Sequence, residues 1–95
     1  MKFEWDENKE KENIRKHKVT FSEAMQAFAD ENAVDLFDEL NSDDEIRYQI
    51  IALSPIRLLF VSYTIREIID EEIIRIISAR KANAKQERYY NEHKR

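Results

Sequence analysis

The sequence predicts an α+β fold: an antiparallel β-sheet meander flanked by two N-terminal helices and one C-terminal helix. Helical patterns lie near both ends of the chain, and three strand-like runs follow one another between them. Strands and helices that are segregated along a chain are typical of α+β proteins. Because 95 residues suffice for one modest core, we expect a single domain over residues 1–95.

The N-terminal residues predict a short strand followed by a surface helix. Lys2–Trp5 carries aromatic side chains and is predicted to be the strand. Asp6 is placed to cap a helix that runs to about His17. Ile14 is almost the only aliphatic residue in this helix, so we expect the helix to lie on the surface.

A second helix is predicted from the sequence T-F-S-E. Thr20 and Glu23 have the spacing of a capping box, and Val19 and Ala24 that of a hydrophobic staple. An apolar stripe follows at helical spacing, which predicts core positions. Its members are Phe21, Ala24, Met25 and Phe28.

The remainder of the chain predicts a sheet and a last helix. Residues 30–32 and 41–44 have the composition of turns. The apolar residues between them follow neither the helical nor the strand period cleanly, and we favour a strand over 33–40. The three strand-like runs are Glu45–Leu53, Arg57–Arg66 and Glu72–Ser78. Their short connections favour antiparallel pairing. The last helix is expected over 79–92, with Ser78 as its cap.

Composition narrows the classes of function. The chain has no cysteine and two histidines, which excludes a disulfide framework and makes a dedicated metal cage unexpected. No apolar run approaches the length of a membrane span, so we expect a soluble cytoplasmic protein that does not bind membranes. Net charge is −4, but residues 20–46 hold nine acidic and no basic residues, whereas residues 75–95 hold seven basic and two acidic. This split predicts one surface for anions and another for a basic partner.

Alternation along the strands places candidate functional side chains together. Glu45, Arg47 and Gln49 share one face of their predicted strand, and Arg75 interrupts the apolar final strand. If Arg75 lies on the same open sheet surface as Glu45 and Arg47, the three suit a phosphodiester: arginine binds phosphate bidentately, and a carboxylate can take a proton. The alternative is a cross-strand ion pair that merely satisfies Arg75.

Further candidates lie around the predicted last helix. Arg80 and Lys81 would stand at its N-terminus, where cations oppose the helix dipole unless an anion joins them; ordinary solvent-facing cations are the alternative. His17 belongs to the residue type that titrates near neutral pH, although a cation is also favourable at a helix C-terminus. Tyr90 is a candidate for base stacking or proton donation, or for packing against the sheet.

Several stretches together resemble the BrnT family of ribonuclease toxins from bacterial type II toxin–antitoxin pairs. They are FEWDENK at 3–9, Asn13, KHKVTFSEA at 16–24, Phe28 with Asp30, EIR at 45–47, and RIISARKA at 75–82 with Glu87, Arg88 and Tyr90 beyond. The match covers nearly the whole chain. Lys18 and Ala52 stand where the family usually or often has glycine, and a left-handed backbone at Lys18 would cost about 1 kcal/mol.

The resemblance implies a compact fold similar to RelE-type toxins and metal-independent RNA cleavage without a cofactor. It also implies a hetero-oligomer with a BrnA-like, ribbon-helix-helix antitoxin, through which alone the toxin contacts operator DNA. The residues that carry over as catalytic are His17, Glu45, Arg47, Arg75, Arg80 and Tyr90, with Lys81 and Arg88 as substrate-binding residues. The alternative is a non-enzymatic interaction module whose acidic segment docks a basic partner.

Overall fold

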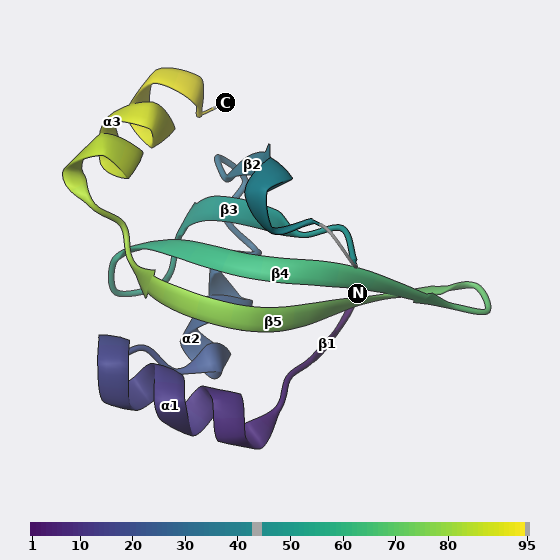
Figure 1. Ribbon diagram of the computed structural model, residues 1–95. Coiled ribbons are helices and arrows are strands. Elements are labelled where there is room, and N and C mark those ends of the chain that lie inside the picture. Colours follow the sequence, from purple (N-terminus) through teal and green to yellow (C-terminus); the bar gives the residue numbers. More distant parts are fainter. Residues whose placement is uncertain (43–44, 95) are drawn as a thin grey trace.

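The computed structural model describes residues 1–42 and 45–94 and has the predicted α+β layout, with three α-helices and one open sheet (Figure 1). Its elements in chain order are β1 (Lys2–Glu4), α1 (Glu7–His17), α2 (Phe21–Ala27), β2 (Val34–Phe37), the 3-10 helix η1 (Glu39–Asn41), β3 (Tyr48–Leu53), β4 (Leu58–Ile68), β5 (Glu71–Lys81) and α3 (Ala84–His93). None of the helices in the described residues has the length and apolar character needed to cross a bilayer.

The sheet has the strand order β1-β5-β4-β3-β2. Strands β2 to β5 form the predicted antiparallel meander. The first strand joins this meander from the other end of the chain, because β1 pairs in parallel with β5, with Glu4 opposite Arg75. A bulge between Ser62 and Tyr63 in the β4–β5 register shifts the pairing by one residue. This arrangement brings the N-terminal residues beside the last strand.

One face of the sheet is the core. The buried residues Val61, Tyr63 and Ile76 of this face pack with Phe21 and Ala24 of α2. In Figure 1, α1 and α2 lie on one side of the sheet and α3 on the other. Side chains alternate along a strand, so the residues between the core positions point to the face opposite α2.

The two N-terminal helices begin where their caps predict. The amides of Asn8 and Lys9 donate to Asp6 Oδ1 at 2.8 and 3.1 Å, and the Glu23 amide donates to Thr20 Oγ1 at 3.0 Å. The prediction of the reciprocal capping-box hydrogen bond, from the Thr20 amide to the Glu23 side chain, is wrong. The Glu23 carboxylate instead accepts from Arg57 Nη2 at 2.7 Å and from the hydroxyl of Ser54 at 2.8 Å, so it ties α2 to the β3–β4 connection.

The connection between α1 and α2 has a left-handed residue. Lys18 has φ 58° and ψ 34°, the conformation that the family glycine would adopt without strain. Its amide donates to the Ile14 carbonyl at 2.9 Å, which closes α1, and its own carbonyl accepts from Arg57 Nη2 at 2.9 Å. The strained turn is therefore held by hydrogen bonds on both sides.

Asn13 fastens α1 to the edge of the sheet. Its side chain is 5% exposed and donates through Nδ2 to the carbonyls of Val19 and Ala79 at 2.9 and 2.8 Å. Its Oδ1 accepts from the Ala79 amide at 3.0 Å. The side-chain amide thus pairs with β5 as a further strand would, beyond the point where β1 ends at Glu4.

Several predicted boundaries are wrong. Strand β3 begins at Tyr48, so Glu45 lies before it, while β4 and β5 run past the predicted ends at Arg66 and Ser78. The last helix does not begin at residue 79, and Ser78 is not its cap. Asn83 caps it, with Gln86 closing a capping box. The long β4–β5 pairing continues through Arg80 and Lys81, where ladder hydrogen bonds and the burial of Ala79 outweigh local helical preference.

The expected strand over residues 33–40 is shorter than predicted. It ends at Phe37, and η1 follows over Glu39–Asn41. Of the predicted turn over 41–44, residues 43 and 44 lie outside the described residues, and Asn41 is the last residue of η1.

Candidate active site on the open sheet face

Three arginines lie on the sheet face opposite the core, and alternation assigns Arg47, just before β3, to the same face. In β4, the residues Phe60, Ser62, Thr64 and Arg66 alternate with the core residues, and Thr64 pairs with Arg75 while Phe60 pairs with Arg80. Extending the β3–β4 register by one residue beyond Tyr48 and Tyr63 places Arg47 opposite Thr64. We call this surface, with Arg47, Arg66, Arg75 and Arg80, the arginine face.

Glu4 links two of these arginines. Its Oε2 accepts from Arg66 Nε at 2.8 Å and from Arg75 Nη1 at 2.9 Å, and its Oε1 accepts from Arg66 Nη2 at 2.7 Å. Hydrogen bonds from Arg66, and then from Arg75, lower the pKa of Glu4 to about 2. The carboxylate is therefore ionised at neutral pH and occupies an anion position between two guanidiniums.

Arg47 and Thr64 carry buried polar atoms without partners. Within the described part of the chain, Arg47 Nε and Thr64 Oγ1 have no hydrogen-bond partner, and Thr64 is only 2% exposed. Buried polar groups are nearly always paired, so this unpaired donor just before β3 and this unpaired hydroxyl on β4 are exceptions that a bound polar group would satisfy. Both atoms belong to residues of the arginine face.

Arg80 stands at the end of the arginine face near α3. Its guanidinium lies 4.7 Å from the centroid of the Phe60 ring, and its Nη1 donates to Gln86 Oε1 at 3.3 Å. Arg80 and Lys81 are strand residues, so the prediction that they stand at a helix N-terminus is wrong. Lys81 is exposed at the end of β5, and Arg88 is exposed on α3.

His17 lies at the β5 margin of the sheet. It ends α1 and lines a hollow of about 230 Å³ together with Asn13, Lys16, Ile77 and Ser78. Ser78 pairs with Ser62 of the arginine face. The hollow therefore joins the histidine to the strand that carries Arg75 and Arg80.

Two of the predicted site residues form no ion pair or hydrogen bond with these arginines in the described part of the chain. Glu45 is exposed ahead of β3, and the carboxylate that pairs with Arg75 is Glu4. Tyr90 is buried, and its hydroxyl donates to Asp30 Oδ2 at 2.7 Å. Burial, together with this hydrogen bond, raises the pKa of Tyr90 to about 12.

Glu4 and Arg66 were not among the residues predicted from the sequence. Arg66 follows Thr64 at strand spacing, so alternation along the long β4 run contains the signal for its face. Glu4 had no such signal, because its position depends on the parallel pairing of β1 with β5. Within the described residues, no three His, Cys, Asp or Glu side chains cluster so as to hold a metal ion.

A sheet face that carries several guanidiniums presents the donors that phosphate oxygens bind. The comparison with protein families points to the same chemistry. Residues 5–86 match the family described as the ribonuclease toxin BrnT of type II toxin–antitoxin systems. The chain therefore belongs to the BrnT family, whose members are ribonuclease toxins paired with an antitoxin. No curated protein matches the chain significantly.

Proposed function

We propose that this protein is a toxin that cleaves RNA by attack of a 2′-hydroxyl on the adjacent phosphate. The products are a cyclic phosphate or 3′-phosphate and a 5′-hydroxyl end. The observation that carries the proposal is the arginine face: four guanidiniums on one rigid surface, next to the unpaired Arg47 Nε and Thr64 Oγ1. Phosphate oxygens are the acceptors that such donors fit.

Arg75 and Arg47 bind the scissile phosphate in this proposal. They flank β4, with Thr64 between them, so their backbones lie about two strand spacings, roughly 10 Å, apart. Side chains as long as arginine converge across this distance on one phosphate. Donors fixed by a sheet need little reorganisation as charge develops, and each is typically worth about 10² to 10³ in rate. Arg80, Lys81 and Arg88 continue the positive charge toward α3 for neighbouring phosphates.

Glu4 takes the role of general base in place of Glu45, because it is the carboxylate in contact with Arg75. An incoming phosphate competes with Glu4 for the two guanidiniums. Loss of those contacts raises the proton affinity of the carboxylate at the moment when the 2′-hydroxyl must lose its proton. Glu4 lies just outside the residues that match the family, so its role rests on geometry.

His17 is the proposed general acid. It lies at the margin of the strand that carries Arg75, and histidine readily donates a proton near neutral pH. Tyr90 is less suited, because its hydroxyl is buried and already bonded to Asp30. Guanidiniums supply the positive charge that a metal ion would otherwise supply, so the proposed reaction needs neither metal nor cofactor.

The proposal includes a partner and a place of action. A BrnA-like antitoxin with a ribbon-helix-helix domain would form a hetero-oligomer with the toxin in the cytoplasm and would carry all contact with operator DNA. The support is the family, whose toxins occur in type II pairs.

The test is cleavage of end-labelled single-stranded RNA by the purified chain in excess EDTA, with the product ends mapped. We expect cleavage by the wild type and a loss of at least 10²-fold for Arg75→Ala and for Arg47→Ala. Arg15→Ala is the matched control, since Arg15 is an exposed arginine that pairs with Glu12 on α1, away from the arginine face. It should cleave as the wild type does.

Three outcomes bear on separate parts of the proposal. Cleavage that stops in EDTA would overturn metal independence. Full activity of folded Arg75→Ala would remove the arginine face from the mechanism, and unfolding of that variant would make Arg75 a structural residue. A folded wild type that never cleaves RNA, on or off the ribosome, would favour a non-enzymatic interaction module.

A further inference from the structure

The end of the β4–β5 hairpin projects beyond its neighbours. Pairing of β3 with β4 ends at Tyr48 and Tyr63, and pairing of β1 with β5 ends at Lys2 and Ile73. Residues 67–72 therefore form a two-stranded ribbon that extends past the body of the protein (Figure 1). Asp70 has φ 59° and closes the turn at its tip.

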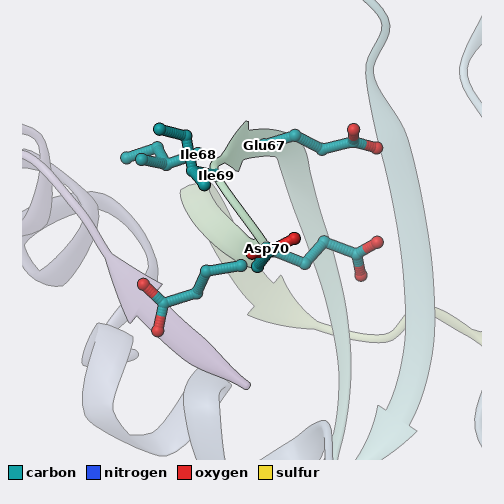
Figure 2. Close-up of a pocket in the computed structure, with 6 residues that line it drawn as sticks. Glu67, Ile68, Ile69 and Asp70 are labelled. Carbon is teal, nitrogen blue, oxygen red and sulfur yellow. The ribbon is translucent and has the colours of Figure 1, made fainter.

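Aliphatic side chains are exposed along this ribbon. Ile69 is 91% exposed and Ile68 46%, and Ile46 beside the ribbon is 56% exposed. Figure 2 shows Ile68 and Ile69 on one side of the tip and Glu67 extending to the other. Clustered exposed aliphatic residues are typical of surfaces that bind another protein.

Carboxylates surround these isoleucines. A shallow hollow of about 570 Å³ is lined by residues 67–72, and another of about 550 Å³ is lined by Glu45, Ile46, Tyr48, Thr64, Ile65, Glu67 and Glu72. The two hollows share Glu67 and Glu72. Together their lining residues include five carboxylates and no lysine or arginine. We call this combined surface the hairpin surface.

The charges of the hairpin surface are poorly compensated within the protein. Glu67 and Glu72 lie directly opposite each other in the β4–β5 register, and like charges in that position destabilise a hairpin. In the part of the chain that the structure describes, Glu71 pairs with Lys2, but Glu67, Asp70 and Glu72 form no ion pair. A binding partner that brings positive charge would relieve this repulsion.

We infer that the hairpin surface binds a basic, extended segment of the antitoxin, with lysines or arginines on Glu67 and Glu72 and aliphatic side chains on Ile65 and Ile69. The β4 residues beyond Thr64 pair with no residue of β3, so an extended segment can add to this edge as a strand. The carboxylates of residues 67–72 repel RNA phosphates from the ribbon, whereas Thr64 at its base also borders the arginine face. The inference rests on the antitoxin partner in the proposed function and does not require RNA cleavage.

The probe is a fluorescein-labelled synthetic peptide of 12 residues in which lysine and valine alternate. Its binding to the full chain is measured by fluorescence anisotropy at low and at physiological salt. The test variant is E67K/E72K, which reverses both charges and keeps a like-charged pair in the hairpin. The control is E87K/E92K, which makes the same charge change at exposed positions of α3. Thermal unfolding verifies that both variants fold.

We expect E67K/E72K to weaken peptide binding at least tenfold, and E87K/E92K to change it less than twofold. A peptide with serine in place of valine should also bind at least tenfold more weakly, and hydrogen exchange should slow at the amides of residues 64–68 on binding. Equal effects of the two variants would mean that peptide binding depends only on the net charge of the protein, and this would overturn the inference. Protection confined to β2, or a concentration-dependent dimer that covers the hairpin, would also overturn it. RNA cleavage by E67K/E72K is assayed separately, so a failed ribonuclease proposal does not affect this result.

Discussion

Replacing Glu4 by glutamine separates the stabilising and the catalytic roles of the carboxylate between Arg66 and Arg75. The change keeps the shape of the side chain and removes its charge. The side chains of Glu4, Arg75 and Arg66 remain 25, 39 and 49% exposed, so solvent screens their ion pairs. Exposed pairs contribute about 0.2 to 1 kcal/mol each, and we expect Glu4→Gln to lower the free energy of unfolding by about 1 kcal/mol at pH 7. In a domain of this size that corresponds to about 4 to 8 °C in Tm.

The stability difference should depend on pH in a defined direction. The folded pKa of Glu4, about 2, is below the ordinary value of 4.5. A group with a depressed folded pKa contributes its full stabilisation above the unfolded value and loses it as the pH falls through the folded value. Urea unfolding of the wild type and the variant should therefore differ most above about pH 5, and the two curves should approach each other between pH 4.5 and 2.

Kinetics of the same variant test the catalytic role. If Glu4 is the base, kcat should fall by about 10² to 10⁴ while the protein stays folded. Glu12→Gln is the control, because Glu12 also pairs with arginine and lysine but lies on α1 away from the arginine face. An unchanged kcat with a lower KM would refute the base assignment and leave Glu4 as an anion that the substrate phosphate displaces. A stability difference that does not narrow in acid would refute the electrostatic reasoning.

Three further predictions concern other contacts. Asn13→Ala removes three buried hydrogen bonds and should lower the free energy of unfolding, measured by urea titration, by about 3 kcal/mol. Asn8→Ala, on the exposed side of the same helix, should lower it by less than about 1 kcal/mol. Equal losses for the two variants would contradict the pairing of Asn13 with the edge of β5. Lys18→Gly should raise Tm, with a gain of about 1 kcal/mol, because glycine accepts φ 58° without strain; a loss would mean that the Lys18 side chain matters more than its backbone. Tyr90→Phe should cost about 1 kcal/mol of stability and leave RNA cleavage unchanged; a cleavage rate that falls with it would return Tyr90 to the mechanism.

Local signals in the sequence were sufficient for most elements. Asp6 and Thr20 cap the helices that they predict, and the apolar stripe from Phe21 to Phe28 packs in the core or against it. The meander follows from short connections between strand-like runs. The end of β5 could not be predicted in this way, because Arg80 and Lys81 are compatible with a helix, and the β4 ladder that holds them is a tertiary feature.

The candidate site was predictable only in part, because its assembly also depends on tertiary strand pairing. Alternation along single strands made Arg47 and Arg75 candidates for one sheet face. In the structure Arg75 pairs with Thr64 of β4, and Arg47 directly precedes β3. The carboxylate that meets Arg75 depends on strand order. Glu4 adjoins Arg75 because β1 pairs in parallel with β5, and nothing in a three-residue strand indicates that neighbour.

The parallel pairing of β1 with β5 also affects how the arginine face forms during synthesis. The Glu4–Arg75 contact joins residues 71 positions apart, so it closes after the local hairpins and contributes to slow folding. A growing chain that has not yet released β5 has neither Arg75 nor a completed sheet. The surface that would bind RNA is therefore assembled late in synthesis, whereas β1, α1 and α2 are released first.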